Sequence, residues 1–254
     1  MASLKPALQK IGRAYLHLKV CEAECIRYFE QNPGEVVGDC DSDPNGRVVL
    51  NFKTRVPVPD DIPMIIGDAL QNLRSTLDYL VWELVLAANK QPTKNHMFPI
   101  CDTPDLFKQQ LGRDRLDGIF PEAIAEIERL QPYHYGIKKE LAPIRVLDDF
   151  TNINKHRRIL LTTLAAHSSH TEFISSASGH IVQDTLSPRY DGAEIAVGPI
   201  PSADGEQMEV KGKAIVFLTF NEGAAKGIEV SICLNQLWHF VDKIVVPKFA
   251  RFFV

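Results

Sequence analysis

Residues 61–88, DIPMIIGDALQNLRSTLDYLVWELVLAA, carry a sustained helical pattern. Apolar residues recur there at intervals of three and four: Ile66, Leu70, Leu73, Leu77, Leu80, Leu84 and Ala88. This spacing lines one side of an α-helix. Asp60 or Asp61 suits the N-cap of that helix, and Pro63 suits its first turn. The segment therefore predicts a long helix that lies at the centre of the fold or at an oligomer interface.

A polar strip runs alongside the apolar side of this predicted helix. Its members are Gly67, Gln71, Arg74 and Asp78. A charge beside an apolar core is costly unless it is paired or used, and helix side chains four positions apart meet. We therefore expect Arg74 and Asp78 to pair. Two interpretations stay open, namely a pair at the edge of the core, or an arginine that Asp78 directs towards an anionic ligand such as a phosphate.

Residues 143–164, PIRVLDDFTNINKHRRILLTTL, predict a second long helix. A second polar strip lies on it at intervals of four, three and four: Arg145, Asp149, Asn152 and His156. These groups would serve acid–base chemistry, or would form a buried hydrogen-bonded network. Arg157 falls near the middle of the apolar face and needs a carboxylate there. We expect Asp78, or less favourably Glu83, to supply it, so that the two polar strips face each other.

The remaining segments place strands between the second long helix and a final one. Further helices are expected over residues 6–31, 106–111, 121–130 and 231–253, the last broken at Pro247. Strands are expected over residues 47–58, 171–184, 192–200 and 213–221. The fold class is therefore α+β, a mainly helical bundle with a small antiparallel sheet inserted before the C-terminal helix. We expect a single domain over residues 1–254, with a helical part about 1–166 plus 231–254 and a β-rich insertion about 171–230.

Composition narrows the functional classes. Of 254 residues, 45% are hydrophobic and 24% are charged, and the net charge is −4. This balance excludes a strongly basic field that wraps nucleic acid, although it allows a local basic patch. No apolar run approaches membrane-spanning length, and the N-terminus lacks the hydrophobic block of a signal peptide. Five scattered cysteines argue against a disulfide framework. We expect a cytoplasmic protein with no membrane partner, cofactor or metal site.

Three segments carry a resemblance to a known group of proteins. They are GDALQNLRSTLDYLVWEL at residues 67–84, QPYHYG at 131–136 and NINKHRR at 152–158. They resemble a group of uncharacterised bacterial and phage-associated proteins that carries G-D-x-L-x-N-L-R-S-x-L-D-H, Q-P-Y and N-x-x-K-H-R in this order. The resemblance spans roughly residues 65–158 and implies no established activity.

A second resemblance is to HEPN domains, which are helical and bind nucleotides or cleave RNA. Their signature is an arginine, four to six residues, and then a histidine. Arg74 matches the arginine, but Tyr79 stands five positions later, where related sequences tend to have histidine. Tyrosine, with a pKa near ~10, is a poor base at neutral pH. His156 would supply the imidazole if the two long helices pair.

Three functional hypotheses follow. In the first, the chain is a HEPN-like component of a defence or toxin system that acts on RNA or a nucleotide, with three catalytic residues: Arg74, Asp78 and His156. In the second, it is a non-catalytic module that binds a small anion or nucleotide through four side chains: Arg145, Asp149, Asn152 and Arg157. In the third, it is a structural subunit that forms a homodimer through the apolar back of the first helix, at Tyr79, Trp82 and Leu86.

Overall fold

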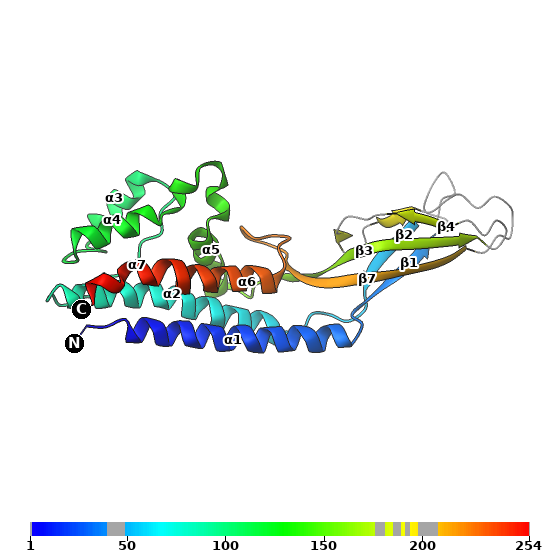
Figure 1. Ribbon diagram of the computed structural model, residues 1–254, viewed down its shortest axis with the longest axis horizontal. Coiled ribbons are helices and arrows are strands. Elements are labelled where there is room, and N and C mark those ends of the chain that lie inside the picture. The colour runs from blue at the N-terminus through cyan, green and yellow to red at the C-terminus, as the bar shows by residue number, and fades with distance from the viewer. Residues whose placement is uncertain are drawn as a thin grey trace. The chain divides into compact units, whose positions relative to one another are not determined.

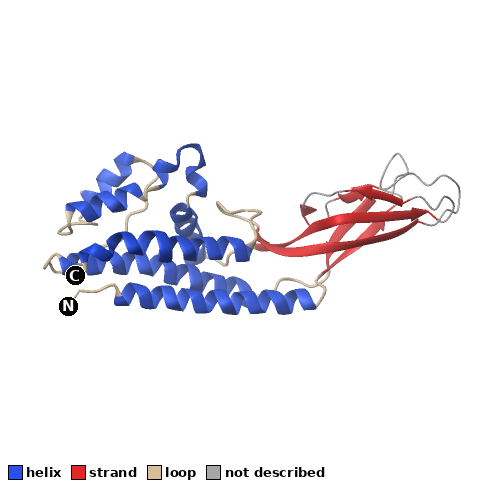
Figure 2. Ribbon diagram, viewed as in Figure 1, coloured by secondary structure: helices blue, strands red, loops and turns tan. Residues whose placement is uncertain are grey.

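The computed structural model describes residues 2–39, 49–175, 181–184, 189–190, 194–197 and 208–253. The chain divides into two compact units (Figures 1 and 2). The helical unit comprises Met1–Ala23, Asp60–Leu160 and Phe220–Val254, and the strand unit comprises Glu24–Pro59 and Leu161–Thr219. The fold is α+β and mainly helical, as the sequence predicts. That the whole chain folds as one domain stays a prediction.

The helical unit is built around α2. Its elements are α1 (Lys5–Glu30), α2 (Asp61–Ala87), α3 (Pro104–Leu111), α4 (Pro121–Arg129), η1 (Pro132–Leu141), α5 (Pro143–His156), α6 (Val230–His239), η2 (Phe240–Val245), α7 (Val246–Phe249) and η3 (Ala250–Phe252). The predicted apolar stripe on α2 is fully buried from Ile66 to Leu84. The α2 helix runs alongside α1 and α6 (Figure 1), and it also contacts α5. The central position expected for this helix is therefore confirmed.

The start of α2 differs from the prediction in one detail. Asp60 occupies the N-cap position, but its side chain makes no capping hydrogen bond. Its carboxylate instead pairs with Arg158, which lies just beyond the end of α5. Pro63 lies in the first turn, where its missing N–H has no helical partner to lose. Asp60 therefore ties the start of α2 to the end of α5.

The second long helix is shorter than the sequence predicts. The α5 helix ends at His156, Arg157 is extended, and β3 begins at Leu161. The segment after Arg157 contains Ile159, Thr162 and Thr163, whose branched side chains favour extended backbone. Helical spacing alone did not distinguish this strand from the end of a helix. Arg157 consequently lies on no apolar helix face, and its expected partnership with Asp78 is wrong.

The last helix changes its winding at the predicted proline. The η2 segment is a π-helix that leads directly into α7, where Pro247 lies in the first turn. Proline has no N–H, so it cannot donate to the Lys243 carbonyl as an α-helical residue would. Such single π-helical turns are commonly found where an α-helical hydrogen-bond pattern is interrupted. The predicted break or kink at Pro247 is therefore replaced by a change of winding just before the proline, and the chain stays helical through it.

The strand unit contains seven strands in its described part. They are β1 (Gly34–Asp39), β2 (Val49–Thr54), β3 (Leu161–Ser175), β4 (Ile181–Asp184), β5 (Arg189–Tyr190), β6 (Glu194–Val197) and β7 (Met208–Phe220). One sheet has the order β1-β2-β6, and the other has β4-β3-β5 with β7 also paired to β3. The pairs β1–β2, β2–β6, β3–β4 and β3–β5 are antiparallel, as expected.

The strand unit also takes Glu24–Pro59 from the N-terminal part of the chain. Its strand β2 pairs on both sides, with β1 and β6. Pro57 and Pro59 lie after β2 ends at Thr54, so neither proline removes a hydrogen bond from the sheet.

Candidate functional site

The pair of Arg74 and Asp78 is confirmed, and it holds a loop. Arg74 Nη2 donates to Asp78 Oδ1 at 3.1 Å and to the Phe98 carbonyl at 2.8 Å. The Phe98 N–H in turn donates to Asp78 Oδ1 at 3.0 Å. Both backbone polar groups of Phe98 are thereby satisfied by one helix pair. The pair thus fastens the segment after α2 back onto the middle of that helix.

Gln131, the first residue of the Q-P-Y segment, holds the same loop from the other side. Its amide is fully buried. Its Oε1 accepts from Cys101 N at 2.9 Å, and its Nε2 donates to the carbonyls of Pro99 at 3.0 Å and Ile127 at 2.9 Å. Residues 98–101 are therefore fixed between α2 and α4. The sequence pattern contained this glutamine, but its role depends on contacts that spacing alone does not reveal.

The α2 and α5 helices pack against each other, as predicted. The contact is tight at Gly67, where an added Cβ would lie 2.3 Å from Asn154 Oδ1. Glycine is required there because the Asn154 side chain occupies the space that any Cβ would take. One part of the sequence hypothesis, the juxtaposition of the two helices, is thus confirmed.

The residues of α5 that face Arg74 and Asp78 are not those that the sequence predicts. Arg74 and Lys155 lie close enough to Asp148 to favour its ionised form, and Lys155 acts in the same way on Asp78. Burial nevertheless raises the pKa of Asp78 and of Asp148, because desolvation outweighs the arginine and lysine charges. The polar residues of α5 that lie near Arg74 and Asp78 are therefore Asp148 and Lys155.

Three members of the predicted second strip lie elsewhere. Asp149 Oδ2 accepts from Ala224 N at 2.8 Å, so it anchors the turn after β7. Asn152 is exposed, and its Nδ2 donates to Asp148 Oδ2 at 3.2 Å. His156 is exposed at the end of α5, about 12 Å along the helix from Asp148 at 1.5 Å per residue. His156 therefore does not share a site with Arg74 and Asp78.

The fourth member, Arg145, belongs to the charged network around Asp148. Its Nε lies 3.3 Å from Asp102 Oδ1, and its Nη1 lies 3.6 Å from Asp148 Oδ2. Glu140 lies further from it, at 3.8 Å. Arg157, the remaining predicted ligand-binding residue, pairs with Glu222 and is 55% exposed. Arg145 and Arg157 therefore each form an ion pair with a carboxylate of the helical unit.

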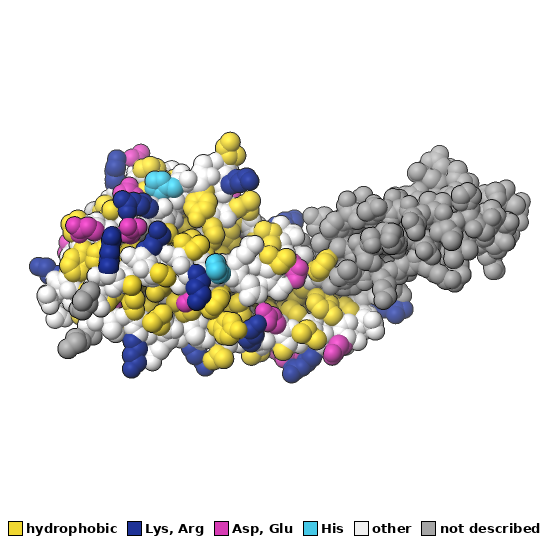
Figure 3. Space-filling view, viewed as in Figure 1, with side chains coloured by type: hydrophobic (Ala, Val, Ile, Leu, Met, Phe, Trp, Pro, Cys, Tyr) yellow, Lys and Arg dark blue, Asp and Glu magenta, His cyan; other side chains and the backbone are white. Residues whose placement is uncertain are grey.

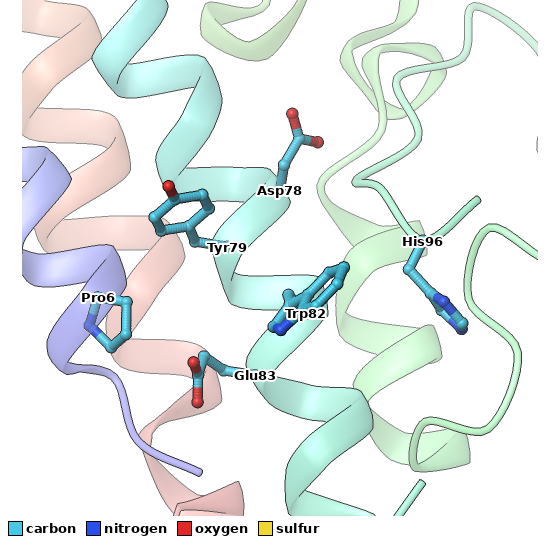
Figure 4. A pocket seen from close by; sticks show the side chains of 6 residues that line it. All are labelled: Pro6, Asp78, Tyr79, Trp82, Glu83 and His96. Carbon is cyan, nitrogen blue, oxygen red and sulfur yellow. The ribbon is translucent and has the colours of Figure 1, made fainter. Parts of the chain in front are cut away.

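A pocket of about 420 Å³ opens beside the Arg74–Asp78 pair; we call it the Trp82 pocket. Figure 4 shows its six lining residues, which come from α1, α2 and the loop after α2: Pro6, Asp78, Tyr79, Trp82, Glu83 and His96. The four α2 residues stand at positions i, i+1, i+4 and i+5, which share one side of a helix. The rings of Tyr79 and Trp82 are 42% and 43% exposed.

The two carboxylates of the pocket are each held by a backbone amide. Asp78 Oδ1 accepts both hydrogen bonds described above, which leaves its Oδ2 without one in the described part of the chain. Glu83 is only 9% exposed, and its Oε2 accepts from Ser3 N at 2.9 Å. Each carboxylate therefore has one oxygen fixed by the protein and one that is not.

The imidazole of His96 is fixed in a single tautomer. Thr93 N donates to His96 Nδ1 at 2.8 Å, so that nitrogen is the acceptor. His96 Nε2 lies 3.0 Å from the Asp117 carbonyl and donates to it. Because both ring nitrogens are bonded within the protein, His96 forms a wall of the pocket and has no free nitrogen to act as a base.

The sequence interpretation named one of the residues that line the Trp82 pocket, Asp78, among its candidate site residues. It treated Tyr79 and Trp82 as an apolar back for self-association, and it did not single out His96. A signal was present in D-Y-x-x-W-E at residues 78–83, which brings two rings and two carboxylates to one side of the helix. What the sequence lacked was the position of α1 and the loop at His96, which close the pocket.

Comparisons with protein-family models, curated proteins and solved structures return no match. The resemblances drawn from the three sequence segments therefore stay predictions. Among the described residues, no helix is long and apolar enough to cross a membrane.

Proposed function

We propose that this protein is a non-catalytic binding module that holds a small organic molecule in the Trp82 pocket. The observation that supports this function is the pocket itself, with a volume of about 420 Å³ and two half-exposed aromatic side chains. Pockets of this size, with apolar walls and a few fixed polar groups, are typical of small-molecule sites. The carboxylates of Asp78 and Glu83 provide those polar groups.

The charges argue against the small anion that the sequence suggested as a ligand. Arg74 is engaged by Asp78 and by the Phe98 carbonyl, and Arg145 lies among Asp102, Asp148 and Glu140. None of the six residues that line the Trp82 pocket is a lysine or an arginine. A phosphate there would meet two carboxylates with no matching cation, which is unfavourable.

The alternative of a HEPN-like nuclease has less support. His156 lies about 12 Å along α5 from Asp148, the α5 residue on which the Arg74 charge acts, which does not support a shared site for the three candidate residues. On the face of the helical unit in Figure 3, basic and acidic side chains are interspersed, which does not favour a polyanion. We expect single-stranded RNA to stay intact when incubated with the protein. Cleavage that disappears in both Arg74→Ala and His156→Ala would restore the nuclease interpretation.

The alternative of a homodimer rests on the same exposed rings, Tyr79 and Trp82. A dimer that buries them would close the pocket, so ligand binding and self-association would compete. Light scattering separates the two. We expect a monomer whose mass is unchanged by Trp82→Glu, whereas a dimer that this substitution dissociates would favour the structural subunit.

A cytoplasmic location is also part of the proposal. Cys101 and Cys233 are buried free thiols. Burial raises the pKa of Cys101 to about 11 and that of Cys233 to about 12, because the apolar surroundings disfavour a thiolate. Thiols of this kind are inert and suit a reducing compartment.

Thermal unfolding in the presence of a small-molecule library tests the proposed function. A ligand that binds only the folded state at 100 times its Kd adds about 2.7 kcal/mol to the free energy of unfolding. We expect at least one compound to raise the melting temperature of the wild-type protein and of Trp238→Phe, whose substitution lies outside the pocket. The same compound should lose its effect on Trp82→Leu. Stabilisation that survives Trp82→Leu would place the site elsewhere.

A further inference from the structure

The Trp82 pocket contains a buried carboxylate without a cationic partner. Glu83 is nine-tenths buried and lines the pocket. Its one hydrogen bond in the described part of the chain comes from Ser3 N, and no lysine or arginine of that part pairs with it. An ionised carboxylate that is removed from water without a counter-charge is unfavourable. A positively charged ligand would supply the missing charge.

The second carboxylate faces the same space. Asp78 Oδ1 is engaged by Arg74 and by the Phe98 N–H, and Oδ2 remains for a further donor. Asp78 and Glu83 both line the Trp82 pocket, but five positions turn about 140° around a helix, and Figure 4 shows the Glu83 carboxylate turned toward α1, on the other side from the Trp82 indole. A group with positive charge or N–H donors in this pocket would therefore meet Asp78 on one side and Glu83 on the other.

The aromatic rings add a second, independent preference for a cation. The face of an aromatic ring attracts a positive charge, and tryptophan attracts it most strongly. This happens at Tyr79, where Lys10 Nζ lies 5.4 Å from the ring centroid. The Trp82 ring has no such partner among the described side chains, although it is 43% exposed.

We propose that the ligand of this pocket is a small organic cation of the alkylammonium class, held against the Trp82 ring and attracted by the carboxylates of Asp78 and Glu83. The inference rests on the proposed function, because it names the class of molecule that the Trp82 pocket binds. The ammonium head lies against the indole on the side of Asp78, and Glu83 adds its charge from the other side of the pocket. Lys10, which lies over the neighbouring Tyr79 ring, opposes this ligand by its charge.

A pair of probes with one shape and two charges tests the proposal. Choline and 3,3-dimethyl-1-butanol differ in the replacement of a quaternary nitrogen by carbon, so only choline is charged. Binding is followed by the fluorescence of Trp82 in the Trp238→Phe protein, which has no other tryptophan. We expect choline to bind at least about tenfold more tightly than the neutral alcohol, as a cation–π contact and an ion pair require.

Two variants separate the contributions of charge. Glu83→Gln keeps an acceptor for Ser3 N and removes the charge, so it should weaken choline binding about tenfold and leave the alcohol unchanged. Lys10→Gln removes the opposing positive charge at the surface and should tighten choline binding. Because Lys10 contributes little to the core, this second variant keeps the test valid if Glu83→Gln fails to fold.

Each outcome decides between the two claims. Equal affinity for the two probes would overturn the cationic ligand and leave the proposed function intact. Loss of thermal stabilisation by both probes in Trp82→Leu, with tight choline binding in the parent, supports both claims. Absence of binding by either probe to the parent protein would overturn the inference, whereas the proposed function is overturned only if no compound of the library stabilises the wild-type protein.

Discussion

At the scale of single residues, the charged side chains of α2 differ in their contacts. Arg74 Nη2 donates to Asp78 and to the Phe98 carbonyl, while Arg74 Nη1 is buried without a hydrogen-bond partner among the described residues. Glu83 is buried, and its one hydrogen bond in the described part of the chain comes from Ser3 N, so it has no cationic partner there. Asp78 both pairs with Arg74 and lines the Trp82 pocket. The sequence predicted the pairing of Arg74 with Asp78, because that pairing depends on local spacing alone.

Removal of Arg74 should destabilise the protein, because Arg74 pairs with Asp78 and bonds the Phe98 carbonyl. Arg74→Ala leaves the Phe98 carbonyl without its donor and Asp78 without its counter-charge, so we expect a loss of about 1–3 kcal/mol in the free energy of unfolding. Arg129→Ala is the matched control, because Arg129 forms an exposed pair with Glu126 and should cost about 1 kcal/mol or less. Urea unfolding measures both. Equal losses in the two variants would contradict the structural role of Arg74.

The raised pKa of Asp148 predicts how stability depends on pH. Burial is the main cause, and it outweighs the charges of Arg74, Arg145 and Lys155. An acid whose pKa is raised in the folded state stabilises that state below its unfolded value, near ~3.9, and loses this contribution as pH rises through the folded value. Asp148→Asn removes the effect. Relative to wild type, the variant should become more stable as the pH rises from ~4 to ~7.

Urea unfolding at several pH values measures this difference. Asp105→Asn is the control, because Asp105 is exposed at the start of α3, and its stability difference from wild type should stay nearly constant. A difference for Asp148→Asn that does not change with pH, or that changes in the opposite sense, would contradict the desolvation of this carboxylate.

At the scale of elements, the packing of α2 against α5 is the contact that organises the helical unit. It is possible because Gly67 leaves room for Asn154. The sequence predicted that these helices meet, but it gave the wrong side of α5. The cause lies at the end of that helix, where the apolar residues Ile159, Leu160 and Leu161 belong to an extended segment. When these three residues are counted as helical, the predicted apolar face of the helix is rotated about its axis and includes Arg157.

Two glycine substitutions test the packing directly. Gly67→Ala introduces a Cβ into the space of Asn154 and should destabilise the protein by about 1–2 kcal/mol. Gly12→Ala, on α1, meets nothing within 4 Å, and should stabilise it by up to about 1 kcal/mol through helix propensity. The double variant Gly67→Ala with Asn154→Ala should recover part of the loss. Thermal melting that shows the same sign for both glycine variants would refute this account of the contact.

Arg157 gives a second test at this scale. The sequence interpretation placed it in the core, whereas the structure places it in an exposed pair with Glu222. Arg157→Ala should therefore cost about 1 kcal/mol or less. Glu222→Ala should cost more, because Glu222 Oε1 also accepts from Leu160 N at 2.6 Å. A larger loss of unfolding free energy for Arg157→Ala than for Glu222→Ala would instead support the interpretation that Arg157 is buried in the core.

At the scale of the whole molecule, local pattern predicted most elements and few of their partners. The α+β class and six of the helices, α1 to α6, follow from periodicity and, for several of them, from prolines in the first turn. The strand unit could not be predicted in full, because it joins Glu24–Pro59 to Leu161–Thr219 across more than a hundred residues. The Trp82 pocket was missed for the same reason. Its walls come from α1, α2 and a loop, and only the α2 wall is visible in one stretch of sequence.

The central claim is that the Trp82 pocket binds a small organic molecule. A two-dimensional ¹H–¹⁵N spectrum tests it directly, because Trp82 and Trp238 are the chain's two tryptophans and each gives one indole signal. During a titration with choline, we expect the Trp82 signal to shift and saturate while the Trp238 signal stays in place. A Trp82 signal that does not move with choline or with 3,3-dimethyl-1-butanol, or one that moves only in parallel with Trp238, would contradict the account.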